Sequence, residues 1–251
     1  LQIKSPIGTG IFVLTREEVS KLSFSGEARE MLMPFYKDSD IRKWTPDNTI
    51  RLFIIYTDRL APENNQILEY LSQFKQILNK RREVRTNTIK WWQLHWPRKR
   101  DMFISEKLLV PQRSHFNTFS YTSSPWFASA DVYYITAKSK EISLKYILAL
   151  VNSKVYYHWL YHRGKRKGEM LELYQTPLSE IPIPRISFDH QQQFIKIVDE
   201  ILSITNQANY LNDDNAKSAV NVLEMEIDQL TYDLFDLNPD EIDLLENLTI
   251  P

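Results

Sequence analysis

The chain contains no cysteine and no long hydrophobic run. Without cysteine it can form neither disulfides nor thiolate metal sites, and its five histidines are scattered without a ligand spacing. The longest apolar runs, such as Leu52 to Tyr56, are far too short to cross a membrane. No signal peptide is visible at the start, where charged and turn residues lie close together. We therefore expect no metal, no membrane association and a cytoplasmic location.

Common enzyme motifs are also missing. The chain has no Asp/Glu-x-Lys nuclease element, no GxGxxG, no P-loop and no GxSxG. Gly8-Thr9-Gly10 is too short to hold a nucleotide and predicts a turn. Asp38 and Asp40 fit the start of a helix or turn better than a metal pair. The sequence thus predicts that this chain is not an enzyme by itself and binds no cofactor.

What the chain does have is a strongly uneven charge distribution. Its 251 residues carry a net charge of −1, but the part from Asp189 to the end holds two basic and fourteen acidic residues, a net −12. The part before Asp189 holds 29 basic and 18 acidic residues, a net +11. Such an asymmetry favours a polyanion-binding body joined to an acidic segment. The alternative is a solvated acidic helical tail with no special partner.

The periodicity of apolar residues predicts an α+β fold in two parts. A mixed α/β domain over residues 1–185 would be followed by an acidic helical hairpin over residues 186–251. Pro182 and Pro184 separate the two parts. Strands are expected at Ile11 to Leu14, Arg51 to Thr57, Lys107 to Val110 and Asp131 to Thr136. Helices are expected near Asn65 to Arg82, from Leu144 to Trp159, after a cap at Asp189, around Val220 to Leu234, and after Asn238.

The densest basic cluster lies between Lys80 and Arg113, with ten cations against three acids. Phosphates require cations on a shared face, and arginine also pairs with guanine edges. The cluster therefore predicts a nucleic-acid surface, to which we assign Arg81, Arg82, Arg85, Arg98, Lys99 and Arg100. Tryptophans interleave with these cations, and for them packing in the core is favoured over base stacking. A solvated charged loop is the alternative for the whole cluster.

Two shorter strings extend this prediction. Gln112, Arg113 and Ser114 follow the strand expected at Lys107 to Val110, and these side-chain types pair with adenine, guanine and phosphate. Lys165, Arg166 and Lys167 lie in the glycine-bracketed segment RGKRKG, which we expect to be a phosphate-clamping loop. In this hypothesis Arg81, Arg82, Lys99 and Lys165–Lys167 hold phosphates. Gln112 and Arg113, with Arg98 and Arg100, read bases.

The order of short motifs resembles one family, the TaqI-like C-terminal specificity domains, over about 185 residues. The motifs that carry the resemblance are GTGIF (8–12), PFYKDSDIRKW (34–44), YLSQFKQILNKRR (70–82), WWQLHWPR (91–98), KLLVPQRS (107–114), Asn152-Ser153-Lys154 and IPIP (181–184). The segment EIDQLTYDLFDLNPDEI (226–242) also resembles the ending of type IIG enzymes and related methyltransferases.

The resemblance implies that the chain is the target-recognition part of an adenine-specific DNA methyltransferase in a restriction–modification system. Its partners would then be double-stranded DNA and an upstream methyltransferase domain. The Asn/Asp-Pro-Pro-Tyr/Phe motif of such methyltransferases is absent here. S-adenosylmethionine, and Mg²⁺ where the parent also cleaves DNA, would therefore belong to domains outside this chain. The start at Leu1 instead of methionine likewise suggests a piece of a longer polypeptide, with processing or numbering as the alternative explanations.

A second hypothesis is a protein-interaction module that docks a partner through the acidic helical tail. Replacing Lys165, Arg166 and Lys167 with alanine distinguishes the two hypotheses. The first expects weaker DNA binding, and the second expects unchanged DNA affinity with loss of a protein partner.

Overall fold

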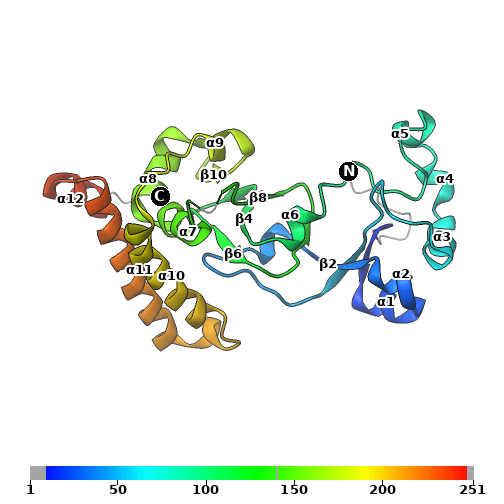
Figure 1. Cartoon of the computed structure of the whole chain (residues 1–251), viewed down its shortest axis with the longest axis horizontal. Helices are drawn as coiled ribbons and strands as arrows, with labels where there is room; N and C mark the ends of the chain where they lie inside the picture. The colour runs from blue at the N-terminus through cyan, green and yellow to red at the C-terminus, as the bar shows by residue number, and fades with distance from the viewer. Residues whose placement is uncertain (1–9, 140, 248–251) are drawn as a thin grey trace. The chain divides into compact units, whose positions relative to one another are not determined.

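The computed structural model describes residues 10–139 and 141–247, whose helices and strands are drawn in Figure 1. These residues form two compact units. Unit 1 holds residues 10–36, 49–104 and 125–128, and unit 2 holds residues 37–48, 105–124, 129–139 and 141–247. Helices and strands occur in both units, which confirms the expected α+β class. The chain crosses between the units several times, so the separate roles expected for residues 1–185 and 186–251 stay a prediction.

Unit 1 is built on a four-stranded sheet with the order β1-β3-β2-β7. Strand β3 (Leu52–Ile55) is the strand expected from the apolar run, and it pairs antiparallel with β1 (Val13–Thr15) and β2 (Leu32–Tyr36). Strand β7 (Phe127–Ala128) adds parallel to β2. Of the turn expected at residues 8–10, only Gly10 lies among the described residues.

Short helices surround this sheet. Helix α1 (Arg16–Leu22) begins with a capping box, in which Glu18 N donates to Thr15 Oγ1 at 3.2 Å and Thr15 N donates to Glu18 Oε2 at 2.7 Å. The single helix expected over Asn65 to Arg82 is wrong. It is divided into three helices because i→i+3 bonds, such as Phe74 N to Leu71 O at 2.9 Å, tighten the chain between them. The three are α3 (Asn65–Ser72), α4 (Lys75–Leu78) and α5 (Arg82–Arg85), the last of which begins at the end of the expected range. Helix α2 (Gly26–Glu30) precedes them in the chain and α6 (Asp101–Ile104) follows them.

Unit 2 contains two three-stranded sheets. The first has the order β6-β4-β8, with β4 (Lys107–Pro111) between β6 (Ser120–Thr122) and β8 (Val132–Ile135). All five residues of β4 are buried, as expected for a central strand. The second sheet has the order β5-β10-β9 and is described with the site below.

Ser153 divides the helix expected from Leu144 to Trp159. It adopts an extended backbone (φ −76°, ψ 164°) between α7 (Leu144–Asn152) and α8 (Lys154–Arg163). The buried Asn152 amide accepts from Phe119 N at 3.1 Å and donates to Phe119 O at 3.0 Å. The Asn-Ser-Lys motif is therefore explained by folding, since it ends a helix and satisfies the backbone of Phe119, the residue before strand β6.

The proline-rich segment after α9 (Gln175–Ser179) is held on these helices by two tyrosines. Tyr146 OH donates to Pro184 O at 3.0 Å, and Tyr156 OH donates to Pro182 O. Because proline offers no N–H of its own, its carbonyl is the group available for such a bond. The IPIP segment is thus held against helices α7 and α8 by these two hydrogen bonds, and the chain continues from there into the tail.

The acidic tail is helical, as expected, and its apolar faces join the core of unit 2. Helix α10 (Phe188–Thr205) packs against α7 and α11 (Asp214–Leu234), and α10 and α11 run side by side in Figure 1. The cap expected at Asp189 is wrong: Ser187 is the cap, and its side chain accepts from His190 N. A short turn (Tyr210–Asn212) precedes α11, and α12 (Pro239–Asn247) follows it. The tail contributes to this core Phe194, Val198, Ile201, Leu202, Val220, Leu223 and Ile227.

Among the described helices, none combines the length and the apolar character needed to cross a membrane.

Candidate nucleic-acid interface

A hairpin and a strand from a distant part of the sequence form one small sheet in unit 2, which we call the basic sheet. Its central strand β10 (Met170–Glu172) pairs antiparallel with β5 (Arg113–Ser114) on one side and with β9 (Lys165–Lys167) on the other. The structure thereby brings together two of the predicted site clusters, those at residues 112–114 and 165–167.

The segment RGKRKG is a strand and a turn, which corrects the expected loop. Lys165–Lys167 form β9, and Gly168 and Glu169 turn the chain into β10. Gly168 has φ +62°, a conformation that glycine adopts at little cost. At the other end a Cβ on Gly164 would collide with the carbonyl of Leu160. Both glycines are therefore required by the backbone of this hairpin, and all three cations between them are exposed.

The register of the basic sheet distributes its cations over two faces. Glu172 is opposite both Arg113 and Lys165, and Leu171 is opposite both Ser114 and Arg166. Directly opposed residues point to the same face of a sheet, and neighbours along a strand point to opposite faces. Arg113, Lys165 and Lys167 therefore share one face, and Arg166 lies on the other.

Arg113 is held in a fixed orientation by β10. Its Nε donates to Glu172 Oε1 at 3.3 Å and its Nη2 donates to Tyr174 OH at 2.9 Å, while Tyr174 OH donates to Glu172 Oε1 at 2.7 Å. The hydrogen bond from Tyr174, then the Arg113 guanidinium, hold the pKa of Glu172 below its ordinary value. The arrangement is a preoriented guanidinium beside an ionised carboxylate.

Two aromatic residues that the sequence reading missed support the cations. Lys165 Nζ lies 5.9 Å from the ring centroid of Tyr174, and the Arg166 guanidinium lies 3.9 Å from that of Tyr161 on α8. These are cation–π distances. Tyr174 could not be found from the sequence because its contact with Arg113 depends on a strand pairing between distant segments.

The neighbours of Arg113 are anchored differently. Gln112 donates its backbone N–H to Asp131 O at 2.8 Å and accepts from Leu173 N at 2.9 Å, with its side chain half-buried. Ser114 Oγ lies 2.8 Å from Thr118 Oγ1. Gln112 and Ser114 thus flank Arg113 along the chain, and the Ser114 side chain lies on the opposite face of the basic sheet from Arg113.

Arg81, in unit 1, is engaged with its own fold. Its guanidinium donates to three carbonyls: Nε to Leu78 O at 3.1 Å, Nη1 to Gln93 O at 2.8 Å and Nη2 to Trp91 O at 2.6 Å. Burial lowers its pKa from the ordinary value. These bonds give Arg81 the role of fixing the loop at residues 91–93, where the sequence had predicted a phosphate contact.

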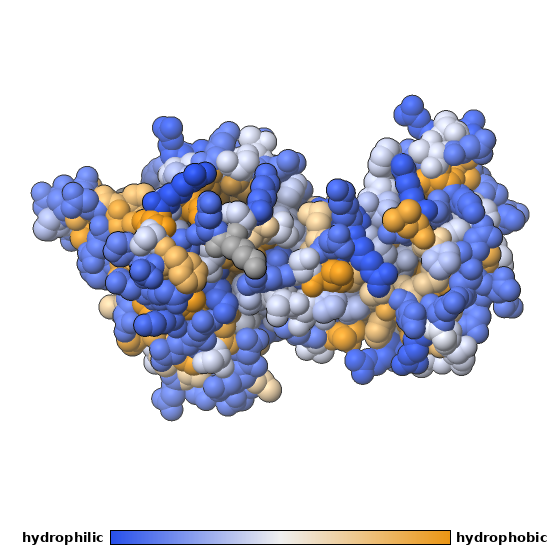
Figure 2. All heavy atoms as spheres, in the orientation of Figure 1, coloured by the Kyte–Doolittle hydropathy of each residue, from blue (hydrophilic) through white to orange (hydrophobic). Residues whose placement is uncertain are grey.

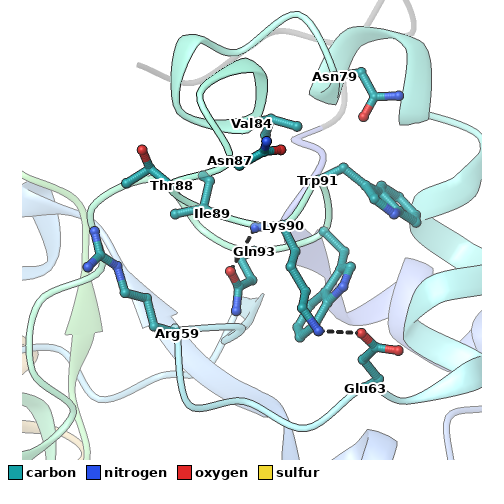
Figure 3. A pocket seen from close by; sticks show the side chains of 11 residues that line it. Arg59, Glu63, Asn79, Val84, Asn87, Thr88, Ile89, Lys90, Trp91 and Gln93 are labelled. Carbon is teal, nitrogen blue, oxygen red and sulfur yellow. Dashed lines mark hydrogen bonds and ion pairs between the residues drawn. The ribbon is translucent and has the colours of Figure 1, made fainter.

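The remaining predicted cations also belong to unit 1. Arg82 and Arg85 are exposed on α5, Lys99 and Arg100 are exposed before α6, and Arg98 is half-buried. Near α5 an open hollow of about 670 Å³ is lined by polar side chains including Asn87, Thr88 and Gln93 (Figure 3). Lys90 spans it to Glu63, with Nζ 2.5 Å from Oε1. With its amide and hydroxyl groups, this hollow resembles a solvated polar surface more than an enclosed ligand site.

The aromatic and basic residues of the predicted cluster do not behave alike. Trp92 is buried, as expected from core packing, but Trp96 is 66% exposed. Lys107 is fully buried, and its Nζ donates to Ser105 O and Ser124 O, both at 2.8 Å. Burial lowers the pKa of Lys107 to about 8. Lys107 therefore contributes to the stability of the fold, although it lies in the basic cluster of the sequence.

The histidines and carboxylates of the described residues do not gather into a metal site. His158 and His162 lie one helical turn apart on α8, a spacing that the sequence reading overlooked, with ring centroids 6.3 Å apart. Within residues 10–139 and 141–247 no group of three or more potential ligands is close enough to hold a metal ion. The face drawn in Figure 2 is mostly hydrophilic, with hydrophobic side chains in small separate patches.

Comparisons with known proteins agree with the resemblance in the sequence. Residues 39–183 match the family described as the TaqI-like C-terminal specificity domain. Two curated relatives come from Haemophilus influenzae. The type II methyltransferase M.HincII is 26% identical over 170 residues, 64% of this chain and 32% of its own length. The type II methyltransferase M.HindII is 29% identical over 107 residues, 42% of this chain and 20% of its own. The chain thus spans a third or less of these relatives.

Among solved structures, that of the type IIG restriction endonuclease BpuSI aligns with this chain at a TM-score of 0.46 and 11% sequence identity. The alignment covers 86% of this chain and 27% of the BpuSI chain.

Proposed function

Because the chain belongs to the family of TaqI-like C-terminal specificity domains, we propose that it recognises a specific sequence of duplex DNA for a larger restriction–modification methyltransferase. The observation that carries this proposal is the basic sheet. It places Arg113 in one row with Lys165, and Lys167 on the same face. A polyanion-binding surface made from distant segments is what a domain that docks on DNA requires.

In this mechanism the exposed cations of β9 contact phosphates and set the register of the domain on the duplex. Arg113, preoriented by Glu172 and Tyr174, points its remaining donors to a base edge. Gln112 and Ser114 beside it would read or hold neighbouring groups. The major groove of B-DNA admits a β-ribbon and gives each base pair a distinct pattern of donors and acceptors. A small sheet with a fixed arginine fits that groove. Arg82, Arg85, Arg98, Lys99 and Arg100 of unit 1 would supply further phosphate or base contacts.

The chemistry of methyl transfer lies outside this chain in the proposal. The sequence has no glycine-rich cofactor loop, and no described cluster of three ligands could hold a metal ion. S-adenosylmethionine, and Mg²⁺ in a parent that also cleaves, therefore do not fit the residues present. We assign both to the upstream methyltransferase domain or other domains of the parent polypeptide, which is the second partner proposed for this chain. The alternative of a docking module that works through the acidic tail receives no support from the comparisons.

The test is the salt dependence of binding to a mixed-sequence duplex. The variant Lys165→Ala/Lys167→Ala removes two cations from the face of Arg113, and Lys196→Ala/Lys217→Ala removes the same charge from the tail of the same unit. We expect the first variant to bind more weakly and to lower the slope of log K against log[salt] by about 2, at roughly 0.9 per phosphate contact. The control variant should keep the slope of the native chain. Equal behaviour of the two variants would contradict the proposal.

A further inference from the structure

Trp96 in unit 1 is presented to solvent by an unusual backbone. Its side chain is 66% exposed, and its φ is +53°. A bulky residue rarely adopts a positive φ, because its Cβ meets the following carbonyl, so the surrounding structure must impose this conformation. Backbone strain of this kind concentrates at functional positions, and the inference runs from the observed outlier to a role.

The loop around Trp96 is braced on both sides. Before it, Leu94 N donates to Thr57 O at 2.8 Å, and His95 Nε2 lies 3.0 Å from Glu83 Oε2. After it, the carbonyl of Arg98 accepts from Tyr56 OH. These bonds attach the residues that flank Trp96 to unit 1 while leaving its ring outside. The indole is thus held out by a fixed loop, which spares the entropic cost of ordering it on binding.

Cations lie near Trp96, although Glu83 also reaches the neighbouring His95. The Arg59 guanidinium lies 5.9 Å from the centroid of the indole ring, and exposed Lys99 and Arg100 follow in the same loop. By contrast, the tryptophans at positions 44, 92 and 126 are buried in the core. A planar aromatic ring beside several cations matches the combination that binds nucleic acid without a paired partner strand, where bases stack on the ring and cations meet the phosphates.

We propose that Trp96 stacks on the face of a nucleobase exposed by an unpaired nucleotide or an opened base step, with Arg59 and Lys99 near the adjoining phosphates. The inference rests on the proposed function in one respect, that the chain binds DNA, and adds to it a contact made by unit 1 to a base face. Base faces are hidden within a regular duplex, so this contact requires a local opening.

The test uses the full chain and three probes of mixed sequence: a fully paired duplex, the same duplex with one unpaired nucleotide, and a single strand. The variants are Trp96→Ala and Trp96→Phe, with Leu60→Ala as the control that truncates another exposed apolar side chain of unit 1. Thermal melts of each variant establish that it is folded.

We expect Trp96→Ala to bind the duplex with an unpaired nucleotide and the single strand about 5- to 150-fold more weakly, the equivalent of roughly 1–3 kcal/mol of stacking. Trp96→Phe should retain most of the affinity, and Leu60→Ala all of it. Titration with these probes should quench a part of the tryptophan fluorescence that is missing in Trp96→Phe. An equal loss on the fully paired duplex would mean that the chain opens a step itself, which also supports the proposal.

The proposal is overturned if Trp96→Ala binds all three probes as Leu60→Ala does, as it would if Trp96 met a protein or lipid surface. If in that case the Lys165→Ala/Lys167→Ala variant still loses DNA, the stacking inference alone fails. If the native chain binds none of the probes, the proposed function fails with it.

Discussion

Arg113 and Lys165 lie in one row of the basic sheet, on either side of Glu172. One acid between two cations leaves this face positive while fixing the direction of Arg113, whose Nε lies 3.3 Å from Glu172 Oε1. Lys165 is exposed, and its Nζ lies 5.9 Å from the ring centroid of Tyr174. The sheet thus combines an arginine held by two hydrogen bonds, suited to a base edge, with exposed lysine charges, suited to phosphates.

Removing the charge of Glu172 should separate these two roles. Glu172→Gln leaves a hydrogen-bond acceptor but makes the face more positive, so we expect binding to mixed-sequence duplex to tighten by a factor of up to about five, since surface charge interactions amount to roughly 1 kcal/mol or less. Sequence preference should weaken at the same time, because Arg113 is less firmly oriented. Anisotropy titrations measure the first effect and motif enrichment the second. Weaker binding to mixed-sequence DNA would contradict the assignment.

The geometry of Arg113, and not only its charge, should determine specificity. Arg113→Lys keeps the cation but lacks the rigid planar fork with which Arg113 bonds Glu172 and Tyr174 and keeps further donors free for a base edge. We expect it to lose roughly 1–3 kcal/mol of discrimination at one position of the recognised sequence, while the salt slope stays unchanged. Competition between the preferred duplex and single-position variants measures this loss. A Lys variant with native discrimination would show that Arg113 does not read a base.

Arg81 should matter for stability. Arg81→Ala leaves the carbonyls of Trp91 and Gln93 without the guanidinium donor and removes one of the two donors to Leu78 O, so we expect the free energy of unfolding to fall by roughly 2–4 kcal/mol. The matched control is the adjacent exposed Arg82, whose change to alanine should stay within about 0.5 kcal/mol. Denaturant melts followed by tryptophan fluorescence provide both values. Equal stability of the two variants would refute the bracing role of Arg81.

Such differences between neighbouring arginines mark the limit of prediction from the sequence. The apolar residues at three- and four-residue steps between Asn65 and Arg82 predicted one buried face. Ile67, Leu71, Phe74 and Leu78 are buried, because burial follows the helical period, whereas Leu68 of the same set is half-buried. The spacing could not predict that i→i+3 bonds would divide the helix, since a 3₁₀ turn buries the same face.

The candidate site shows the same limit. Composition identified Arg113 and Lys165–Lys167 as separate basic strings, but their meeting depends on pairing through β10, which no local pattern specifies. The expected loop at Lys165–Lys167 became a strand for the same reason. Trp92 and Trp96 have similar sequence surroundings and opposite exposure, because hydrogen bonds from distant residues fix the loop between them.

Asp228 on α11 should make stability depend on pH. It is buried, its Oδ1 accepts from Lys154 N at 2.8 Å, and burial raises its pKa from 3.8 to about 6. The folded state therefore holds the proton more tightly than the unfolded state. This contribution to stability is present below pH 4, is lost as the pH rises from about 4 to about 6, and stays absent above.

Asp228→Asn keeps an acceptor for Lys154 and removes the titration. Relative to this variant, the native chain should lose up to roughly 3 kcal/mol of stability across that interval. Denaturant melts at pH values from about 4 to 7 check the difference. Parallel stability curves, or a native chain that gains stability over the interval, would show that Asp228 does not titrate as described.

The most direct test of the central claim is selection of a randomised duplex pool by the purified chain at low salt, with sequencing of the retained molecules. The account predicts that the native chain enriches one short motif, that Arg113→Ala loses the preference at one position of it, and that Lys165→Ala/Lys167→Ala retains less DNA without changing the motif. Retention of DNA with no enriched motif, or a motif that is unchanged in Arg113→Ala, would contradict sequence recognition by the basic sheet.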